Sequence, residues 1–254
     1  LSAKLMLKHK TKKHDIEMAY TYKKELISEN SVEYEMRDSA GYSVPHNGKE
    51  LYMIYSMRAN NTLDANRMEA YLQDTYRFTS KGGHTHFTLN YGVRMSHWSF
   101  NKETIVSPRV SLGIIPAYSE NTTFRFAAGL YYQAPFFKEL RDTSTVNGIT
   151  YANLNEKIKS PRSIHFIAGY DYRFRINNLR YRFSAEAYYK ALGNFIPYSV
   201  NNVKVVYYGE NRASGHATGI DLKLYGEFVP GADSWLTFSL MNTSMKLNGK
   251  SVPL

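Results

Sequence analysis

Few residues of this sequence stand where they could do covalent or metal-assisted chemistry. The chain has no cysteine, so it has neither a thiolate nucleophile nor a thiolate metal site. His84 and His86 are two positions apart at a strand start and could share a metal ion, but a catalytic zinc needs three protein ligands. Ser107 and Ser234 lack the Gly-x-Ser-x-Gly turn of a hydrolase nucleophile, and no glycine-rich phosphate loop is present. We therefore expect no enzyme activity, no cofactor and no metal site.

Charged side chains recur at every second position of several segments, opposite apolar side chains. This alternation places them on one face of a β-strand. Such a face either meets water in a soluble sandwich or lines the wet lumen of a membrane barrel whose apolar face meets lipid. We interpret the charged set as a salt-bridged lumen wall, because charges buried there need partners; the alternative is a ligand path. The residues expected on this wall are Arg109, Arg125, Asp171, Arg173, Asp221, Lys223 and Glu227.

A second group of residues combines aromatic rings with an amide where one strand leads into a long loop. We predict that a ligand is bound near this group; the alternative is an aromatic girdle at the outer membrane surface. The candidate ligand-binding residues are Tyr131, Tyr132, Gln133, Phe136 and Phe137.

The elements that position these residues are long strands. From Gly219 to Met241 the chain alternates on both sides of a turn at Val229–Asp233, where proline and glycine favour a reversal. The same period recurs along most of the chain, and about ten segments can supply the ~9–11 residues of a tilted membrane-spanning strand. We predict an all-β fold, namely part of a transmembrane antiparallel β-barrel whose strands pair as a meander.

The connections between these strands alternate in length. Short turns on one side and long loops on the other are the topology of an outer-membrane barrel. We expect irregular loops over Glu29–Gly48, Pro135–Ser160 and Asn194–Asn211, with a separate strand-like piece at Leu51–Met57 above the membrane and another at Val203–Tyr208. The short turns are Lys10–Lys13, Ser80–Gly83, Ala117–Asn121, Arg175–Leu179 and Val229–Asp233.

Composition argues against a helical membrane protein and against a nucleic-acid-binding protein. No apolar run approaches the ~18 residues of a membrane helix, whereas 22 tyrosines suit an aromatic girdle. The formal net charge is +10, but most basic residues are spread along the strands. The dense run from Lys8 to His14 lies between two strand patterns, which indicates a hairpin end near water or lipid headgroups. We predict outer-membrane lipid as a partner and no nucleic acid.

Short motifs on successive strands resemble those of TonB-dependent outer-membrane receptors. Each motif is weak alone, but their order and spacing agree from Glu69 to Leu240. The tyrosine-rich strands are most similar to those of receptors from Bacteroidetes. The motifs are Ala70–Asp74 for Y-x-Q-D, Tyr91–Arg94 for G-x-R, Ser107–Arg109 for S-P-R, Gly129–Leu140 for G-x-x-Y-x-x-P-x-x-x-E-L, and Asn211 with Gly219–Asp221 for N followed by G-x-E/D.

The resemblance implies a receptor in the bacterial outer membrane that imports a scarce ligand with energy from TonB. Its barrel would have about 22 strands, of which residues 1–254 form a part without the plug domain and the closing strand. The implied partners are the TonB complex, the receptor's own plug domain and, as a further candidate, a surface lipoprotein. The ligand class (siderophore, cobalamin, glycan or peptide) stays open, and so does a passive porin-like or adhesin barrel. We expect an open curved sheet in which Leu1–Leu7 does not pair with Trp235–Met245.

Overall fold

The computed structural model describes residues 1–37, 52–201, 204–229, 231–247 and 250–253. They form one 13-stranded sheet and a separate two-stranded hairpin. The strands are β1 (Ser2–Lys10), β2 (His14–Arg37), β3 (Tyr52–Thr79), β4 (His86–Trp98), β5 (Glu103–Ile115), β6 (Thr122–Tyr132), β7 (Arg141–Val146), β8 (Ile149–Leu154), β9 (Arg162–Ile176), β10 (Leu179–Phe195), β11 (Tyr198–Asn201), β12 (Lys204–Tyr207), β13 (Ala213–Val229), β14 (Ala232–Leu247) and β15 (Lys250–Pro253). A short 3₁₀ helix, η1 (Phe137–Leu140), precedes β7.

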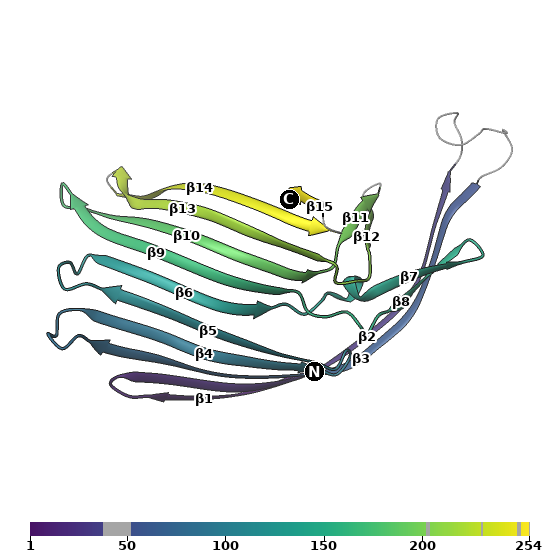
Figure 1. The fold of residues 1–254 in the computed structure, drawn as a ribbon, viewed down its shortest axis with the longest axis horizontal. Coiled ribbons are helices and arrows are strands. Elements are labelled where there is room, and N and C mark those ends of the chain that lie inside the picture. The colour runs from purple at the N-terminus through teal and green to yellow at the C-terminus, as the bar shows by residue number, and fades with distance from the viewer. Residues whose placement is uncertain (38–51, 202–203, 230, 248–249, 254) are drawn as a thin grey trace.

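The long strands pair antiparallel in chain order, as predicted. The sheet runs β1-β2-β3-β4-β5-β6-β9-β10-β13-β14-β15, with β7 and β8 attached at the side and β11 pairing β12 apart from it (Figure 1). Short turns join β1 to β2, β3 to β4, β5 to β6 and β9 to β10, as antiparallel pairing permits, whereas β6 and β9 and also β10 and β13 are joined by long connections that contain further strands. The all-β meander predicted from the alternation is therefore confirmed.

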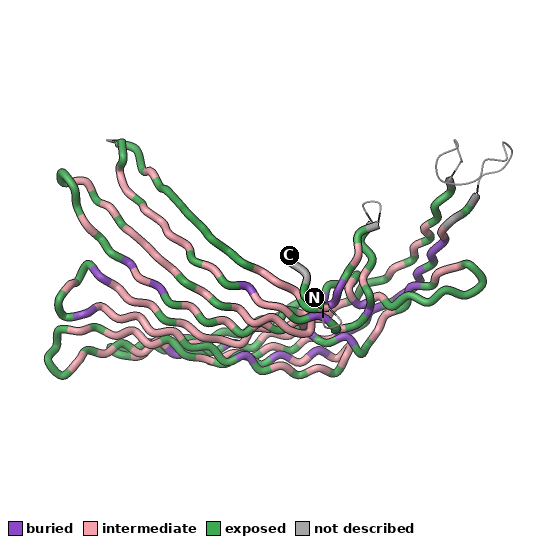
Figure 2. The backbone as a smooth tube through the Cα atoms, turned by 45° about the horizontal axis from the view of Figure 1, so that its top comes forward, coloured by how far each residue is buried: buried purple, intermediate pink, exposed green. Residues whose placement is uncertain are grey.

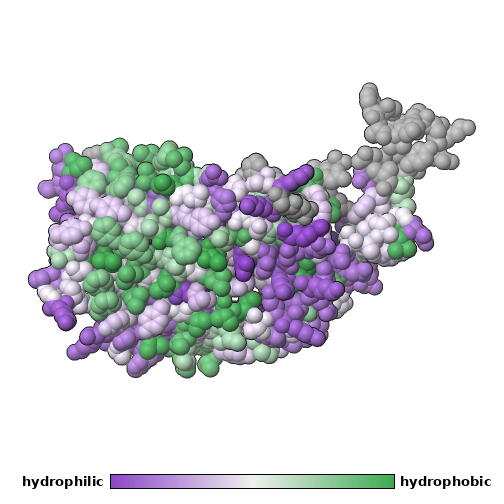
Figure 3. Space-filling view, in the orientation of Figure 1, coloured by the Kyte–Doolittle hydropathy of each residue, from purple (hydrophilic) through white to green (hydrophobic). Residues whose placement is uncertain are grey.

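The main sheet keeps most of its apolar side chains at the surface. Ile220 of β13 pairs with Ala187 and Leu240, so apolar residues of neighbouring strands lie side by side. Ile220 and Leu240 are 51% and 59% exposed, and Figure 2 shows few buried residues along the strands. On the face in Figure 3, hydrophobic residues gather over the middle of the strands, with hydrophilic ones at both ends. An apolar face of this extent requires a partner surface or lipid.

The sheet does not close on itself. Among the described residues, β1 pairs only with β2, while β14 pairs with β13 and β15. Leu1–Leu7 and Trp235–Met245 therefore lie at opposite sides of an open, curved sheet (Figures 1 and 2). This outcome confirms the expected open sheet.

The predicted short turns all join consecutive long strands at one end of the sheet (Figure 1). Asn177 and Asn178 both have positive φ, 50° and 63°, which is the geometry of the tight hairpin turns that match strand twist. Gly83 and Gly231 also adopt positive φ in their turns. Asparagine and glycine tolerate this conformation, so the turn residues explain why the strands reverse there.

The first long excursion is more regular than predicted. β2 continues to Arg37, so Glu29–Arg37 is strand rather than loop. Met53–Met57 belongs to the same continuous strand as Arg67–Thr79, and the separate strand-like piece was a wrong prediction. Residues 38–48 and 51 lie outside the described residues. Backbone pairing between β2 and β3 does not need apolar alternation, which is why a polar pattern gave no sign of it.

The two later excursions also contain regular structure. Pro135–Ser160 includes η1 and the hairpin β7–β8, and Asn194–Asn211 includes the hairpin β11–β12. Of the predicted piece at Val203–Tyr208, Lys204–Tyr207 is a strand and residue 203 is outside the described residues. β8 pairs in parallel with β3 from Met57 to Ala59, an exception to the antiparallel prediction. β4 covers β3 only from Arg67 onward, so β8 occupies an edge that would otherwise be unpaired.

Candidate functional site on the polar face of the sheet

The strand registers separate the sheet into an apolar and a polar face. Phe183 pairs with Leu224 on one side and Tyr172 on the other, so apolar side chains form rows across strands. Successive residues of a strand point to opposite faces, so the charged residues between these positions share the second face. Glu227 lies beyond an irregularity after Gly226, and its carboxylate accepts a hydrogen bond from the Gly231 amide in the turn. The registers place the other predicted wall residues on the polar face: Arg109, Arg125, Asp171, Arg173, Asp221 and Lys223.

A compact ion-pair network crosses the polar face from β6 to β10. Arg125 Nε lies 2.6 Å from Asp171 Oδ2, and Arg182 Nη2 lies 2.9 Å from Asp171 Oδ1. Arg125 also approaches Glu186 at 3.3 Å. The Asp171 side chain is only 6% exposed, and a carboxylate so placed needs such partners. Arg125 and Asp171 are thus paired as the salt-bridged interpretation predicts.

Beside this network, unpaired cations meet aromatic rings. The Arg109 guanidinium lies 4.2 Å from the centroid of the Tyr131 ring, and Tyr131 stacks on His165 with centroids 4.4 Å apart. Lys190 of β10 is the cross-strand partner of His165. Arg109 and Lys190 have no acidic partner among the described residues. A guanidinium stacked on a ring keeps its edge donors free for an anionic group.

A polar hollow of about 500 Å³ opens on the same face next to this cluster. Its lining includes three cations, Lys4, Arg94 and Arg109, one acidic residue, Asp74, and the ring of Tyr71. Glu69 approaches Arg94 at 3.8 Å, while Lys4 lies 5.9 Å from the centroid of the Tyr71 ring. The hollow therefore carries an excess of positive charge together with aromatic surface.

The structure separates the five candidate ligand-binding residues. Tyr131 lies on the polar face, whereas Tyr132, the next residue of β6, points to the apolar face. Gln133 is exposed just after the strand, and Phe136 is 63% exposed at the start of η1. Phe137 packs against an apolar cluster between the loops. Only Tyr131 is thus brought together with the charged wall among the described residues.

That apolar cluster joins segments far apart in the sequence at the loop end of the sheet. Trp98 Nε1 donates a hydrogen bond to Glu25 Oε2 at 3.0 Å. The Arg67 guanidinium lies 4.4 Å from the Trp98 ring centroid, and its Nε is 3.2 Å from Glu25 Oε1. Sequence patterns missed this cluster because its members come from strands and loops that alternate at no common period. Its buried residues are Leu63, Ala65, Trp98, Leu140, Ile158 and Ile196.

Hydrogen bonds hold the same loops to one another. Asn211 Nδ2 donates to the carbonyl oxygens of Asn194 at 2.7 Å and Lys159 at 2.8 Å. Glu103 accepts hydrogen bonds from the amide and the hydroxyl of Ser160. Such ties order connections that would otherwise retain conformational freedom. The loops at this end of the sheet therefore form an ordered surface.

A second tie joins β2, β3, β7 and β8. Arg141 forms an ion pair with Glu29, whose other oxygen accepts a hydrogen bond from Asn61 Nδ2 at 3.0 Å. The same amide donates to the Ala152 carbonyl oxygen at 2.9 Å. Burial lowers the pKa of Arg141 from its ordinary value, but a guanidinium stays charged near neutral pH. The pair therefore persists as a charged link between the long β2–β3 ribbon and the β7–β8 hairpin.

Asp74 is a charged residue on the apolar face. It is 7% exposed and has Tyr91 and Ile16 as its cross-strand partners. Its carboxylate lies 2.7 Å from His14 Nδ1 and accepts hydrogen bonds from the Tyr91 hydroxyl at 2.9 Å and the Asp15 amide at 3.2 Å. Asp74 follows Leu72 by two positions, so the alternation along this strand already indicated that it lies on the apolar face. The charged positions predicted from the sequence did not include Asp74.

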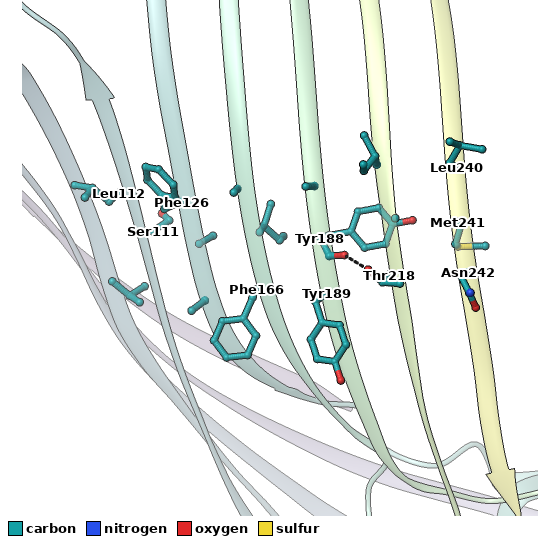
Figure 4. Close-up of a pocket in the computed structure, with 18 residues that line it drawn as sticks. Ser111, Leu112, Phe126, Phe166, Tyr188, Tyr189, Thr218, Leu240, Met241 and Asn242 are labelled. Carbon is teal, nitrogen blue, oxygen red and sulfur yellow. Dashed lines mark hydrogen bonds between the residues drawn. The ribbon is translucent and has the colours of Figure 1, made fainter. Parts of the chain in front are cut away.

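The apolar face also has a hollow, of about 940 Å³. Figure 4 shows Phe166 and Tyr189 close together on neighbouring strands, with Leu112, Phe126 and Leu240 at its sides. Side chains of two adjacent cross-strand rows on the apolar face line this hollow, and most of them are non-polar. It offers little that could orient a polar ligand.

The part of the chain that the structure describes has neither a metal-binding cluster nor a membrane-spanning helix. There, no three His, Cys, Asp or Glu side chains gather to hold a metal ion. His84 lies in the turn before β4 and His86 is the first residue of that strand. None of the described helices is long and apolar enough to span a membrane.

An open antiparallel meander with an apolar and a charged face is a wall segment of an outer-membrane β-barrel. The chain belongs to the TonB-dependent receptor family: residues 9–253 match the family model described as "TonB dependent receptor-like, beta-barrel". The resemblance seen in the motifs is therefore confirmed, as is the location in the bacterial outer membrane. Membership of this receptor family also agrees with the prediction that the domain is not an enzyme.

Solved structures give the same fold. The ferric enterobactin receptor PfeA of Pseudomonas aeruginosa is 14% identical with a TM-score of 0.61, over 98% of this chain and 39% of that one. The outer membrane transporter YddB of Escherichia coli is 13% identical with a TM-score of 0.62, over 99% and 36%. The RagAB peptide transporter is 11% identical with a TM-score of 0.56, over 97% and 30%. No curated protein sequence matches this chain.

The chain matches only a part of each of these solved structures. The chain spans 39% or less of the length of these three structures. At such identities the likeness is one of fold alone, and residues that contact a ligand in those proteins do not transfer to this chain.

Proposed function

We propose that this chain forms part of the wall of an active-transport receptor that imports a scarce ligand with energy supplied through TonB. The observation that carries the proposal is the match of residues 9–253 to the TonB-dependent receptor barrel. The paired charges around Asp171 support it, because a wall that packs against a plug needs compensated charges more than an open water-filled pore does. The complete receptor would add a plug domain and a TonB-binding segment, and its barrel would have about 22 strands.

We also propose how the sheet is oriented in the outer membrane. The apolar face, with its hollow beside Phe166, meets outer-membrane lipid, and the charged face lines the lumen. The tied loops at β7–β8 and β11–β12 lie at the cell surface, where a lipoprotein could rest on them, and the short turns face the periplasm. The contrast in connection length supports this orientation.

The ligand is expected to contact the polar face near Tyr131. Arg109 and His165 contact this ring, and Lys190 is directly opposite His165, so a ligand with an anionic group fits the local charge. Phe136, exposed at the loop end, and the neighbouring Gln133 are secondary candidates. Tyr132 and Phe137 are less suited, since one points to the apolar face and the other is packed between loops. Siderophore, cobalamin, glycan and peptide all remain within the proposal.

The proposal is tested by measuring uptake in cells that express the complete receptor. Accumulation of the ligand should be lost when TonB is deleted or the proton gradient is collapsed. A passive porin-like barrel would keep its uptake under both treatments. An adhesin would show none in any condition.

Variants of the wall test the proposed contact site. Combined Arg109→Ala and Tyr131→Ala substitutions should weaken ligand binding by about tenfold or more, since a cation–π pair and a charge-assisted hydrogen bond are removed. Tyr132→Ala is the matched control, because its side chain lies on the opposite face of the same strand. Equal losses in both variants would place the binding surface elsewhere.

A further inference from the structure

The apolar face carries two cations at the loop end of the sheet. Arg162 of β9 precedes Phe166 by four positions, and Lys246 of β14 follows Asn242 by four. Phe166 and Asn242 line the hollow of about 940 Å³ on the apolar face, and even spacing within a strand keeps side chains on one face. Both cations are exposed. Positive charge therefore lies on the apolar face about 13 Å from the hollow, at ~3.3 Å per residue.

The strand registers place the two cations along one cross-strand row. Arg162 is directly opposite Gly193 of β10, and Lys246 is directly opposite Ser214 of β13, the next strand of the sheet. A Cβ atom at Gly193 would lie 3.1 Å from Arg162 Nε, so the missing side chain lets this guanidinium lie across β10 toward β13. The backbones of β9 and β14 are three strand spacings apart, about 14 Å. Two anionic groups of one molecule can therefore meet the two cations.

The chain supplies no counter-charge for this pair. Neither Arg162 nor Lys246 has an acidic partner among the described residues, and no aspartate or glutamate occupies the apolar face of β9, β10, β13 or β14 between the hollow and the cations. Hydrogen-bonding groups lie there instead, since Ser244 Oγ is 3.1 Å from His216 Nδ1. Guanidinium and ammonium groups both bind phosphate. A phosphate-bearing molecule from outside the chain fits this surface.

The hollow offers space for a hydrocarbon chain next to these cations. Phe166 and Tyr189 lie close together at its side (Figure 4), and the small residues Ala168 and Ala187, directly opposite each other, belong to its lining. A depth of about 13 Å is nearly half of the ~30 Å hydrocarbon core of a bilayer. With the cations at the membrane surface, the hollow lies among the acyl chains of the same leaflet.

We propose that the hollow, Arg162 and Lys246 form a binding site for a phosphorylated glycolipid of the outer leaflet. One acyl chain lies in the hollow, and two phosphate groups on a disaccharide head group contact the two cations. The separation of the cations favours this occupant over a phospholipid, whose single phosphate reaches only one of them. The assignment rests on the proposed function, in which the apolar face meets lipid and the loops lie at the cell surface.

The test is a photo-crosslink between the complete receptor and lipid A that carries a diazirine on an acyl chain. The lipid is added below saturation to receptor in detergent micelles, and crosslinked peptides are identified by mass spectrometry. Crosslinks should map to Phe166 and Tyr189. Phosphatidylglycerol with the same diazirine should give about tenfold less crosslink there, because one charge-assisted contact is missing. Equal yields from the two lipids would overturn the proposal.

Variants of the cations and of the hollow separate the two parts of the site. Combined Arg162→Gln and Lys246→Gln substitutions should lower the lipid A yield by about tenfold or more, whereas exchange of the two residues, Arg162→Lys with Lys246→Arg, should keep most of it. Ala187→Phe should also lower the yield, because the ring occupies the hollow. Ala185→Phe is the matched control, on the same face of β10 but outside the lining. An unchanged yield in the glutamine variant would overturn the proposal.

Failure of this site is distinguishable from failure of the proposed function. TonB-dependent uptake is measured in the same variants, so equal lipid yields with uptake intact would reject the lipid site alone. No crosslink from either lipid at Phe166 and Tyr189 would overturn the site together with the proposed orientation of the sheet.

Discussion

Single residues of the recognised motifs have local structural tasks. A Cβ atom at Gly92 would lie 2.7 Å from the Leu72 carbonyl oxygen, and one at Gly219 would lie 2.5 Å from the Tyr188 hydroxyl. Glu139 accepts a hydrogen bond from the Phe136 amide at 2.7 Å and so closes η1, while Leu140 is 1% exposed. The two glycines let neighbouring strands and side chains approach closely, and Glu139 and Leu140 hold the loop in place. The motifs therefore indicate the family through structural residues, and they carry no information about the ligand.

Asp74 gives a prediction at this scale. Replacing it with alanine should lower the urea concentration at which the complete receptor unfolds, because the Tyr91 hydroxyl and the Asp15 amide lose their acceptor in an apolar setting. Asp74→Asn keeps an acceptor oxygen and should fall between the wild type and the alanine variant. Unfolding at the same urea concentration in all three proteins would show that the network adds nothing to stability.

At the scale of elements, each long strand should tolerate charge on one face only. Phe238 and Ser239 are adjacent in β14, and their cross-strand partners are Leu222 and Asp221. Phe238→Arg should destabilise the receptor by about 2–4 kcal/mol if it lies near the membrane midplane. Ser239→Arg, beside the Asp221 carboxylate, should cost much less. Folding equilibria in lipid or detergent measure both; equal costs would contradict the assignment of the faces.

The connections between elements give a second prediction at this scale. Because the chain has no cysteine, single-cysteine variants can be labelled without background from these residues. A membrane-impermeant maleimide applied to whole cells should label Ser144→Cys in the exposed β7 strand and miss Lys81→Cys in the exposed turn after β3. Labelling of Lys81→Cys in intact cells, with Ser144→Cys protected, would reverse the topology.

For the whole molecule, the unpaired edges of the open sheet determine how residues 1–254 fold when they are studied alone. β1 and β14 are not joined among the described residues, and unpaired strand edges in hydrocarbon cost several kcal/mol for each unsatisfied backbone group. Residues 1–254 refolded alone into detergent should aggregate or stay protease-sensitive, since free edges also pair between molecules. A compact, heat-modifiable band on a gel, typical of closed barrels, would contradict this expectation.

The sequence alone determined the two-faced strands, the short turns and the family. Alternation such as that from Ile220 to Phe228 is visible within one segment, because a strand turns successive side chains to opposite faces. Turns such as Asn177–Asn178 are equally local, since their residues tolerate positive φ.

Tertiary structure decided what depends on register and on distant segments. Glu29–Arg37 became a strand only through its pairing with β3, and Asp74 met His14 across 60 positions of the chain. The opposition of Arg175 to Arg180 follows from the register of one hairpin. Trp98, Leu140 and Ile196 share a cluster although no common period relates them. Pairing between remote residues is set by the hydrogen-bonded ladder and by loop packing, which local patterns do not contain.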